Sequence, residues 1–152
     1  MRYRIDRPIR GRRGARIIGL DRGADMIVAR IAQRQWGYAR FLGLAGPVVG
    51  EVGDAGSESV ALRTTAGAST NLLAELAEAD VAIMVATTGS DTAAATIIGA
   101  ACTVRAIMTA GLVIGDPDMV GPTVAAIRPH ARVLMVSGDE HDVVDVLSAL
   151  RA

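Results

Sequence analysis

Apolar residues fall into two kinds of run that alternate along the chain, and the two kinds predict different elements. Short, continuous apolar runs are typical of strands in a parallel sheet that is covered on both faces. They lie at residues 16–20, 40–44, 60–63, 81–86, 112–115 and 132–136. Longer runs with apolar residues three and four positions apart predict helices. These lie at residues 24–35, 69–78, 92–110, 119–127 and 142–151.

The alternation of strands and helices predicts βαβ units with right-handed crossovers. We therefore expect a three-layer α/β domain with a mostly parallel sheet of about five or six strands, in which the first strand lies beside the fourth. The helix predicted at 92–110 carries a single charged residue, Arg105. A helix this apolar lies centrally on a sheet face or against another subunit, and we expect a homo-oligomer formed through it.

The chain of 152 residues is long enough for one domain, which buries roughly 70% of the surface of its unfolded chain. We expect an arginine-rich arm at 1–14 and a single domain at 15–152. Cys102, the only cysteine, lies within an apolar run and is expected to be a core residue. No apolar run reaches ~18 uninterrupted residues and no secretory leader is visible, so we expect no membrane span and a cytoplasmic location.

The net charge is zero, but the two ends of the chain differ in sign. The acidic residues near the carboxyl end are Asp139, Glu140, Asp142 and Asp145. Within the first sixteen residues, Asp6 is the only acidic residue. The arginines of this segment are Arg2, Arg4, Arg7, Arg10, Arg12, Arg13 and Arg16. Such an arm can bind phosphate groups, but more often it is solvated or docks on an acidic protein surface. Because the chain has few aromatic residues for stacking, we expect no nucleic-acid partner.

All the basic residues are arginine, which excludes several kinds of site. A Walker A phosphate loop, a Schiff-base enzyme and a receiver-type phosphoacceptor domain each need a lysine. The two histidines, His130 and His141, lie in separate segments without the spacing of a zinc site. We expect both histidines on the surface.

The turn that follows the apolar strand 81–86 is the strongest candidate for a phosphate site. It offers backbone N–H groups at a helix N-terminus, together with threonine and serine hydroxyls. Asp91 places a carboxylate where a phosphate would sit, although an aspartate is also a good helix N-cap. The turn therefore has the scaffold of a nucleotide site more than the composition of a working one. Its residues are Thr87, Thr88, Gly89, Ser90, Asp91 and Thr92.

Acidic residues follow several of the predicted strands. Because the carboxyl ends of parallel strands meet at one edge of the sheet, these side chains are expected at the edge where α/β proteins bind ligands. A ring of carboxylates there could hold Mg²⁺ through oxygen ligands, or each carboxylate could cap the helix that follows it. Both alternatives stay open for Asp21, Asp116, Asp118, Asp139 and Glu140.

Four segments together resemble the nucleotide-binding half of the FtsZ/tubulin family over about residues 15–150. Residues 16–28 are similar to the family's first strand and glycine-rich loop, and 66–68 to its short phosphate-side loop. Residues 79–95 resemble the signature loop, with Gly89 and Thr92 at matching positions, and 127–136 resemble the sixth strand. The resemblance implies a Rossmann-like domain that binds GTP, GDP or another nucleotide.

The chain departs from this family where the phosphates would bind. Side chains replace the small residues of the signature loop at Ser90, Asp91, Ala93 and Ala95. In the first loop Asp21 and Arg22 likewise occupy glycine positions. The chain also ends before the central helix and the acidic loop that complete GTP hydrolysis in the family. The resemblance therefore implies a minimal relative without GTPase activity.

We first consider a non-catalytic domain that binds a nucleotide or another phosphate-bearing ligand, with Arg22 as the cation that offsets the phosphate charge. The alternative is an oligomeric structural or regulatory protein that acts through its apolar helix and arginine arm. A weaker alternative is a magnesium-dependent enzyme that uses the strand-end carboxylates. The candidate site comprises Gly19, Asp21, Arg22, Gly23, Ala24, Asp25, Thr65, Ala66, Gly67, Ala68, Thr87, Thr88, Gly89, Ser90, Asp91 and Thr92.

Overall fold

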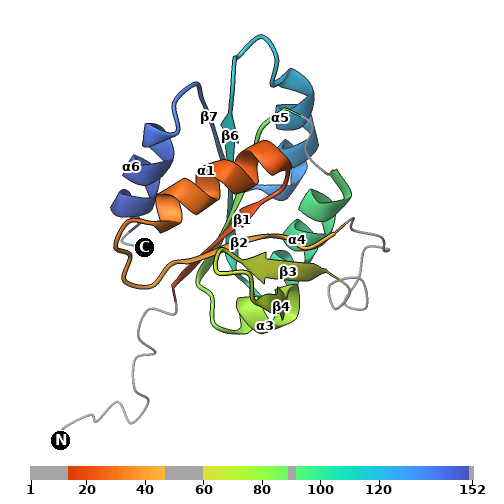
Figure 1. Ribbon diagram of the computed structural model, residues 1–152. Coiled ribbons are helices and arrows are strands. Elements are labelled where there is room, and N and C mark those ends of the chain that lie inside the picture. The colour runs from red at the N-terminus through yellow and green to blue at the C-terminus, as the bar shows by residue number, and fades with distance from the viewer. Residues whose placement is uncertain (1–13, 47–59, 89–91, 151–152) are drawn as a thin grey trace, which may run out of the picture.

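A computed structural model describes residues 14–46, 60–88 and 92–150. Its strands form one sheet in the order β4-β3-β2-β1-β5-β6-β7 (Figure 1). The strands are β1 (Ala15–Gly19), β2 (Arg40–Leu44), β3 (Ala61–Thr64), β4 (Ser69–Asn71), β5 (Val81–Ala86), β6 (Met108–Ile114) and β7 (Val133–Ser137). The helices are α1 (Arg22–Ala32), α3 (Leu72–Ala77), α4 (Thr92–Val104), α5 (Gly121–Ile127) and α6 (His141–Ala149), with a 3₁₀ turn at Arg128–His130.

The five strands from β2 to β7 in the sheet order are parallel, and a short hairpin extends the sheet on one side. β1 pairs with β2 and with β5, and Ile17 lies opposite Ile83 of β5. The expected three-layer α/β fold is confirmed, and so is the expected pairing of the first and fourth strands of the sequence prediction. The sheet of the described residues has seven strands instead of five or six, because residues 69–71, expected to be helical, form β4, which pairs antiparallel with β3 beside β2.

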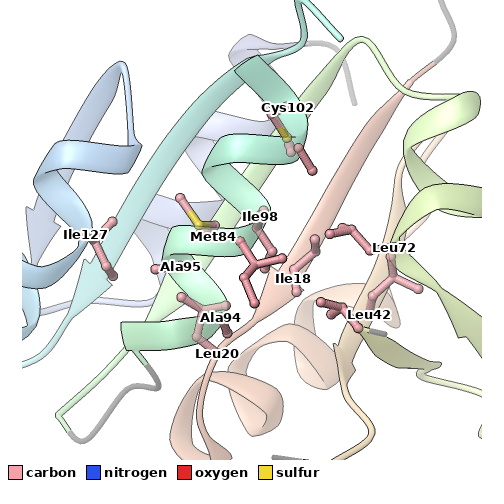
Figure 2. Close-up of a cluster of buried hydrophobic side chains, with 14 of the residues drawn as sticks. Ile18, Leu20, Leu42, Leu72, Met84, Ala94, Ala95, Ile98, Cys102 and Ile127 are labelled. Atoms are coloured by element: carbon pink, nitrogen blue, oxygen red, sulfur yellow. The ribbon is translucent and has the colours of Figure 1, made fainter. Parts of the chain in front are cut away.

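Helices cover both faces of the sheet and divide the core into two clusters. α1 and α6 pack on one face, where Ile17 and Ile83 of the central strands are fully buried (Figure 1). On the other face, α3, α4 and α5 cover Ile18 and Met84, as Figure 2 shows. Because β1 and β5 are buried on both faces, their sequences are continuously apolar with the exception of Arg16.

The prediction of one long helix at 92–110 is correct for residues 92–104 and wrong for the residues that follow. α4 ends at Val104, and Ala106 then adopts a left-handed conformation with φ 54°. The N–H of Ile107 donates to the carbonyl of Cys102 (2.9 Å), which closes the helix end. The next apolar residues form β6 from Met108, not from residue 112. Two adjoining apolar runs gave one pattern, and the pattern alone does not tell a buried helix from a buried strand.

The helix expected at 69–78 is also shorter. Residues 69–71 form β4, and α3 begins at Leu72 with Asn71 as its N-cap. The Asn71 side chain accepts from the N–H of Ala74 (2.9 Å). The other helices lie within three residues of their expected positions. Among the described residues, no helix has both the length and the apolar composition needed to cross a bilayer.

A buried ion-pair network joins α3 to the first two strands. Glu75 of α3 accepts two hydrogen bonds from Arg40 (2.8 and 2.9 Å) and lies 3.2 Å from Nε of Arg16. Arg16 also donates to the carbonyls of Glu75 and Glu78. Burial lowers the pKa of Arg16. Burial by itself would raise the pKa of Glu75, but hydrogen bonds from Arg40 and Thr70, together with the charges of Arg40 and Arg16, hold that pKa below its usual value.

Candidate functional site

The strand order reverses between β1 and β5, which is where doubly wound sheets bind ligands. From β1 the chain passes through α1 to β2 on one side, and β5 lies on the other side. The N–H of Leu20 donates to the carbonyl of Val85 (2.9 Å), so the two strands stay paired to their carboxyl ends. The turns that begin at Asp21 and Thr87 therefore lie side by side.

Asp21 occupies the position between these two turns with its own side chain. Its carboxylate accepts from the N–H of Ala24 (2.7 Å), which makes Asp21 the N-cap of α1. It also accepts from the N–H of Thr87 (2.7 Å) and from the Thr87 hydroxyl (2.6 Å). These donors, at the N-terminus of α1 and the end of β5, are the kind that bind a phosphate oxygen. The carboxylate of Asp21 thus holds the anion position of the site.

Gly23 and Ala24 make the close contact between α1 and the β5 turn possible. A Cβ atom at position 23 would lie 2.7 Å from Oγ1 of Thr87, so only glycine leaves room for that hydroxyl. Ala24 is fully buried beneath the turn. Arg22, in contrast, is exposed on the first turn of α1. The predicted first loop is therefore a tightly packed helix cap, and Arg22 is the part of it that faces solvent.

The carboxylate of Asp25 lies over two paired glycines. Gly19 of β1 and Gly43 of β2 are register partners. Cβ atoms at these positions would lie 2.4 and 2.7 Å from Oδ1 of Asp25. This oxygen is buried without a hydrogen-bond partner among the described residues. The pKa of Asp25 is raised to about 6, mainly by burial; the charge of Arg63 opposes this rise, and the Asp21 carboxylate contributes to it.

A pocket of about 200 Å³ opens beside Asp25, between α1 and the strands β2 and β3. Gly43 and Arg63 line it, together with Val28 and Ala29 of α1. The charge of Arg63 acts on Asp25, so the pocket has a cation that the sequence analysis did not assign to the site. The alternation of β3 could have indicated Arg63, because Leu62 is buried and its neighbour must point to the opposite face.

The loop 65–68 does not lie with the other predicted segments. It is the turn between β3 and β4, and the N–H of Thr65 donates to the carbonyl of Phe41 (3.3 Å) near the beginning of β2. Thr65 and Gly67 line the far end of the Asp25 pocket. Ala66 and Ala68 line a separate hollow with Arg40. Because β3 runs antiparallel to β2, this turn lies toward the amino end of β2, away from Thr87.

The turn that follows β5, residues 87–92, is only partly described. Gly89, Ser90 and Asp91 lie outside the described residues, so the expectation that Asp91 blocks a phosphate stays a prediction. Thr88 is exposed directly after the buried strand β5. Thr92 begins α4. The described residues thus agree with the predicted strand before this segment and the predicted helix after it.

The strand-end carboxylates bond to the backbone of their own loops. Oδ1 of Asp116 accepts from the N–H of Asp118, and Oδ1 of Asp139 accepts from the N–H of His141, both at 2.9 Å. Within the described ranges, no group of three histidine, cysteine or acidic residues could hold a metal ion. Asp21 is the N-cap of α1, so the capping alternative holds for that carboxylate. The N-caps of α5 and α6 are Val120 and Glu140, and neither makes a side-chain cap bond, so Asp116 and Asp139 bond within their loops and do not cap the next helix in the expected way.

Cys102 and His130 lie on the α4 side of the sheet. Cys102 is fully buried, as expected, and burial raises the pKa of its thiol to about 12. His130 is only half-exposed, because its Nε2 lies 3.1 Å from Oγ1 of Thr96 on α4. His141 is exposed, as expected. α4 itself packs its apolar side chains into this chain's own core, which removes the reason for expecting a subunit contact along the whole helix.

The strand order and the contacts at the carboxyl ends of β1 and β5 define a doubly wound α/β domain of Rossmann-like topology. The carboxylate of Asp21 caps a helix at its switch point. Comparison of the chain with protein-family models, with curated proteins and with solved structures finds no match. The family resemblance therefore rests on the sequence patterns alone.

Proposed function

We propose that this chain is a non-catalytic domain that binds a small phosphate-bearing ligand, such as a nucleotide, at the switch point between β1 and β5. The observation that carries the proposal is the set of donors gathered there. The N–H groups of Ala24 and Thr87 and the Thr87 hydroxyl converge on one anion, at the N-terminus of a helix. In this chain that anion is the carboxylate of Asp21.

Asp21 determines how strongly such a ligand can bind, because a phosphate must compete with the Asp21 carboxylate for the same hydrogen-bond donors. A carboxylate beside an incoming phosphate repels it, and two like charges at such a site cost several kcal/mol. We therefore expect weak binding by the natural chain. Arg22, which is exposed beside Asp21 in the sequence, and Arg63 in the pocket next to Asp25 are the cations that would offset the charge of a ligand at the carboxyl ends of the strands.

The variant Asp21→Asn tests the proposal. The asparagine carbonyl can still cap α1, but the negative charge is gone and the N–H of Thr87 is released. Thermal shift and equilibrium dialysis with GTP, GDP, ATP and inorganic phosphate, each with and without Mg²⁺, should give at least about tenfold tighter binding than the natural chain. Asp80→Asn is a matched control. Asp80 accepts from the N–H of Gly14, and both residues precede central strands, β5 and β1, at the amino ends of the strands and so opposite to the proposed site.

A second candidate function is a structural or regulatory role without a ligand. The same hydrogen bonds of Asp21 favour it, because they satisfy the donors of the edge from within the chain. If folded Asp21→Asn binds none of these ligands, the proposed ligand site is contradicted and the second role is favoured. Equal gains in Asp21→Asn and Asp80→Asn would place binding elsewhere.

A further inference from the structure

The two edges of the sheet differ in how well they are protected from pairing with another strand. β4, at one edge, has three residues, all polar. β7, at the other edge, has five residues, Val-Leu-Met-Val-Ser, without a charge or a proline. Natural edge strands avoid aggregation by being short or by carrying charges, prolines or bulges. β4 has such protection, whereas β7 has none of these features.

The side chains of β7 are apolar and exposed on both faces of the strand. Val133 is 55%, Met135 39% and Val136 42% exposed. Val133 and Met135 lie on the same face as Leu112 of β6, as the register with β6 shows. Met108, at the start of β6, is 40% exposed on that face and extends the apolar strip. Apolar side chains on an unpaired edge strand mark a site of association.

The charges at the two ends of β7 determine which partner fits. Arg128 and Arg132 precede the strand and are exposed. Asp139 follows the strand and is exposed, and Asp142 lies close behind it. A second β7 laid antiparallel brings the basic end of each strand beside the acidic end of the other. A parallel second copy would instead place like charges together.

We propose that two copies of this chain associate through their β7 edges, with the strands antiparallel about a two-fold axis. A strand paired on one side directs the N–H and C=O of alternate residues outward, so two such edges can form a hydrogen-bonded ladder. With Met135 near the axis, Arg132 of each copy lies beside Gly138 and Asp139 of the other. The contact is self-complementary, as a two-fold interface requires.

This interface is independent of the proposed ligand site, because β6 separates β7 from β5. It also differs from the interface expected through the apolar helix. α4 ends at Val104, which is 71% exposed. A substitution at Val104 therefore tests an interface through α4 against an interface through β7.

Light scattering and sedimentation equilibrium on the full chain test the proposal. The natural chain should have twice the 15.7 kDa mass of one copy. Met135→Lys adds a charge to the edge and should shift the protein to one copy. The matched control Met119→Lys, at an exposed methionine outside β7, should leave the dimer intact. A natural chain that is monomeric, a dimer that survives Met135→Lys, or a dimer lost only in Val104→Lys would overturn the proposal.

Charge exchange tests the antiparallel arrangement. Arg132→Asp and Asp139→Arg should each weaken the dimer, by about tenfold in dissociation constant, and the double variant should recover most of that loss. Dimers that weaken further in the double variant would exclude this arrangement.

Covalent trapping gives a readout that does not depend on affinity. Met135→Cys should form a disulfide-linked dimer under mild oxidation, because paired strands bring opposite Cα atoms to about 5.5 Å. Met119→Cys should not form it, and buried Cys102 does not compete. A folded Met135→Cys that stays monomeric on oxidising gels, with the natural chain dimeric, would contradict the position of the axis.

Discussion

The Thr87 hydroxyl donates a 2.6 Å hydrogen bond to the carboxylate of Asp21, across 66 residues of chain. The N–H of the same threonine donates to the second carboxylate oxygen at 2.7 Å. This pair joins the end of β5 to the N-terminus of α1 at the switch point of the sheet. It is therefore a structural link and, under the proposed function, the contact that an incoming anion would have to displace.

Thr87→Val should destabilise the fold by about 1–2 kcal/mol, because it removes a charge-assisted hydrogen bond and keeps the side-chain shape. Urea denaturation measures the loss. Thr88→Val, at the exposed neighbouring position, is the control and should change the free energy of unfolding by less than about 0.5 kcal/mol. Equal effects of the two substitutions would mean that the bond to Asp21 contributes nothing specific.

Asp25 should make stability depend on pH in a window below neutrality. Its pKa is raised to about 6 in the folded chain, against a usual value near 3.8. The folded state therefore binds its proton more tightly, and this stabilising contribution is present below about pH 4 and is lost as the pH rises through about 6. After discounting for solvent screening, we expect a loss on the order of 1–2 kcal/mol. The difference in unfolding free energy between the natural chain and Asp25→Asn isolates it, and a flat difference from pH 4 to 7 would contradict it.

Gly43→Ala should cost about 1 kcal/mol in the natural chain, since the new Cβ would lie 2.7 Å from Oδ1 of Asp25. In an Asp25→Ala background the cost should disappear, because the three nearest atoms to that Cβ all belong to the Asp25 carboxylate. A double-mutant cycle measures the coupling. Gly37→Ala, where nothing lies within 4 Å, is the control. Additive effects at positions 43 and 25 would rule out the contact.

Glu75→Gln should destabilise the fold by about 3 kcal/mol, because it leaves the buried guanidinium of Arg16 without its counter-charge. Chemical denaturation should show a lower midpoint with an unchanged slope. Glu78→Gln is the comparison, since Glu78 is exposed and its charge influences the pKa of Arg16 less than the charge of Glu75 does, while its backbone carbonyl, which accepts from Arg16, is kept. A similar small loss in both variants would show that the network adds little.

Cys102 should not react with a thiol reagent at pH 8 while the protein is folded. Its side chain is fully buried and its pKa is raised to about 12, so neither access nor a thiolate is available. Labelling should follow global unfolding in urea, which a spectroscopic assay with Ellman's reagent detects. Fast labelling in buffer would show that α4 opens locally.

The switch point could be predicted from the sequence, but its chemistry could not. The apolar run 81–86 is a local signal and forms β5 where a strand was expected, whereas for Asp21 helix capping was one of two open alternatives and is the one that the structure shows. The partner of Asp21 is 66 residues away, and nothing in the spacing indicates which strand end Asp21 will meet. The alternation of β3 indicates that Arg63 points away from the face of Leu62, but only the antiparallel pairing of β3 with β2 brings Arg63 beside Gly43 in the pocket of Asp25.

The sequence by itself determined the fold class, the alternation of the strands and helices apart from β4, and the burial of Cys102, because local periodicity and composition fix which segments are covered. Only the tertiary structure decided where 92–110 divides into α4 and β6, since both halves are apolar and the change depends on the left-handed turn at Ala106. It also decided that Gly19 and Gly43 lie together under Asp25, and that β7 is an edge strand of the sheet that the described residues form. These relations join residues distant in sequence, and pairing between strands, which no local pattern encodes, brings them together.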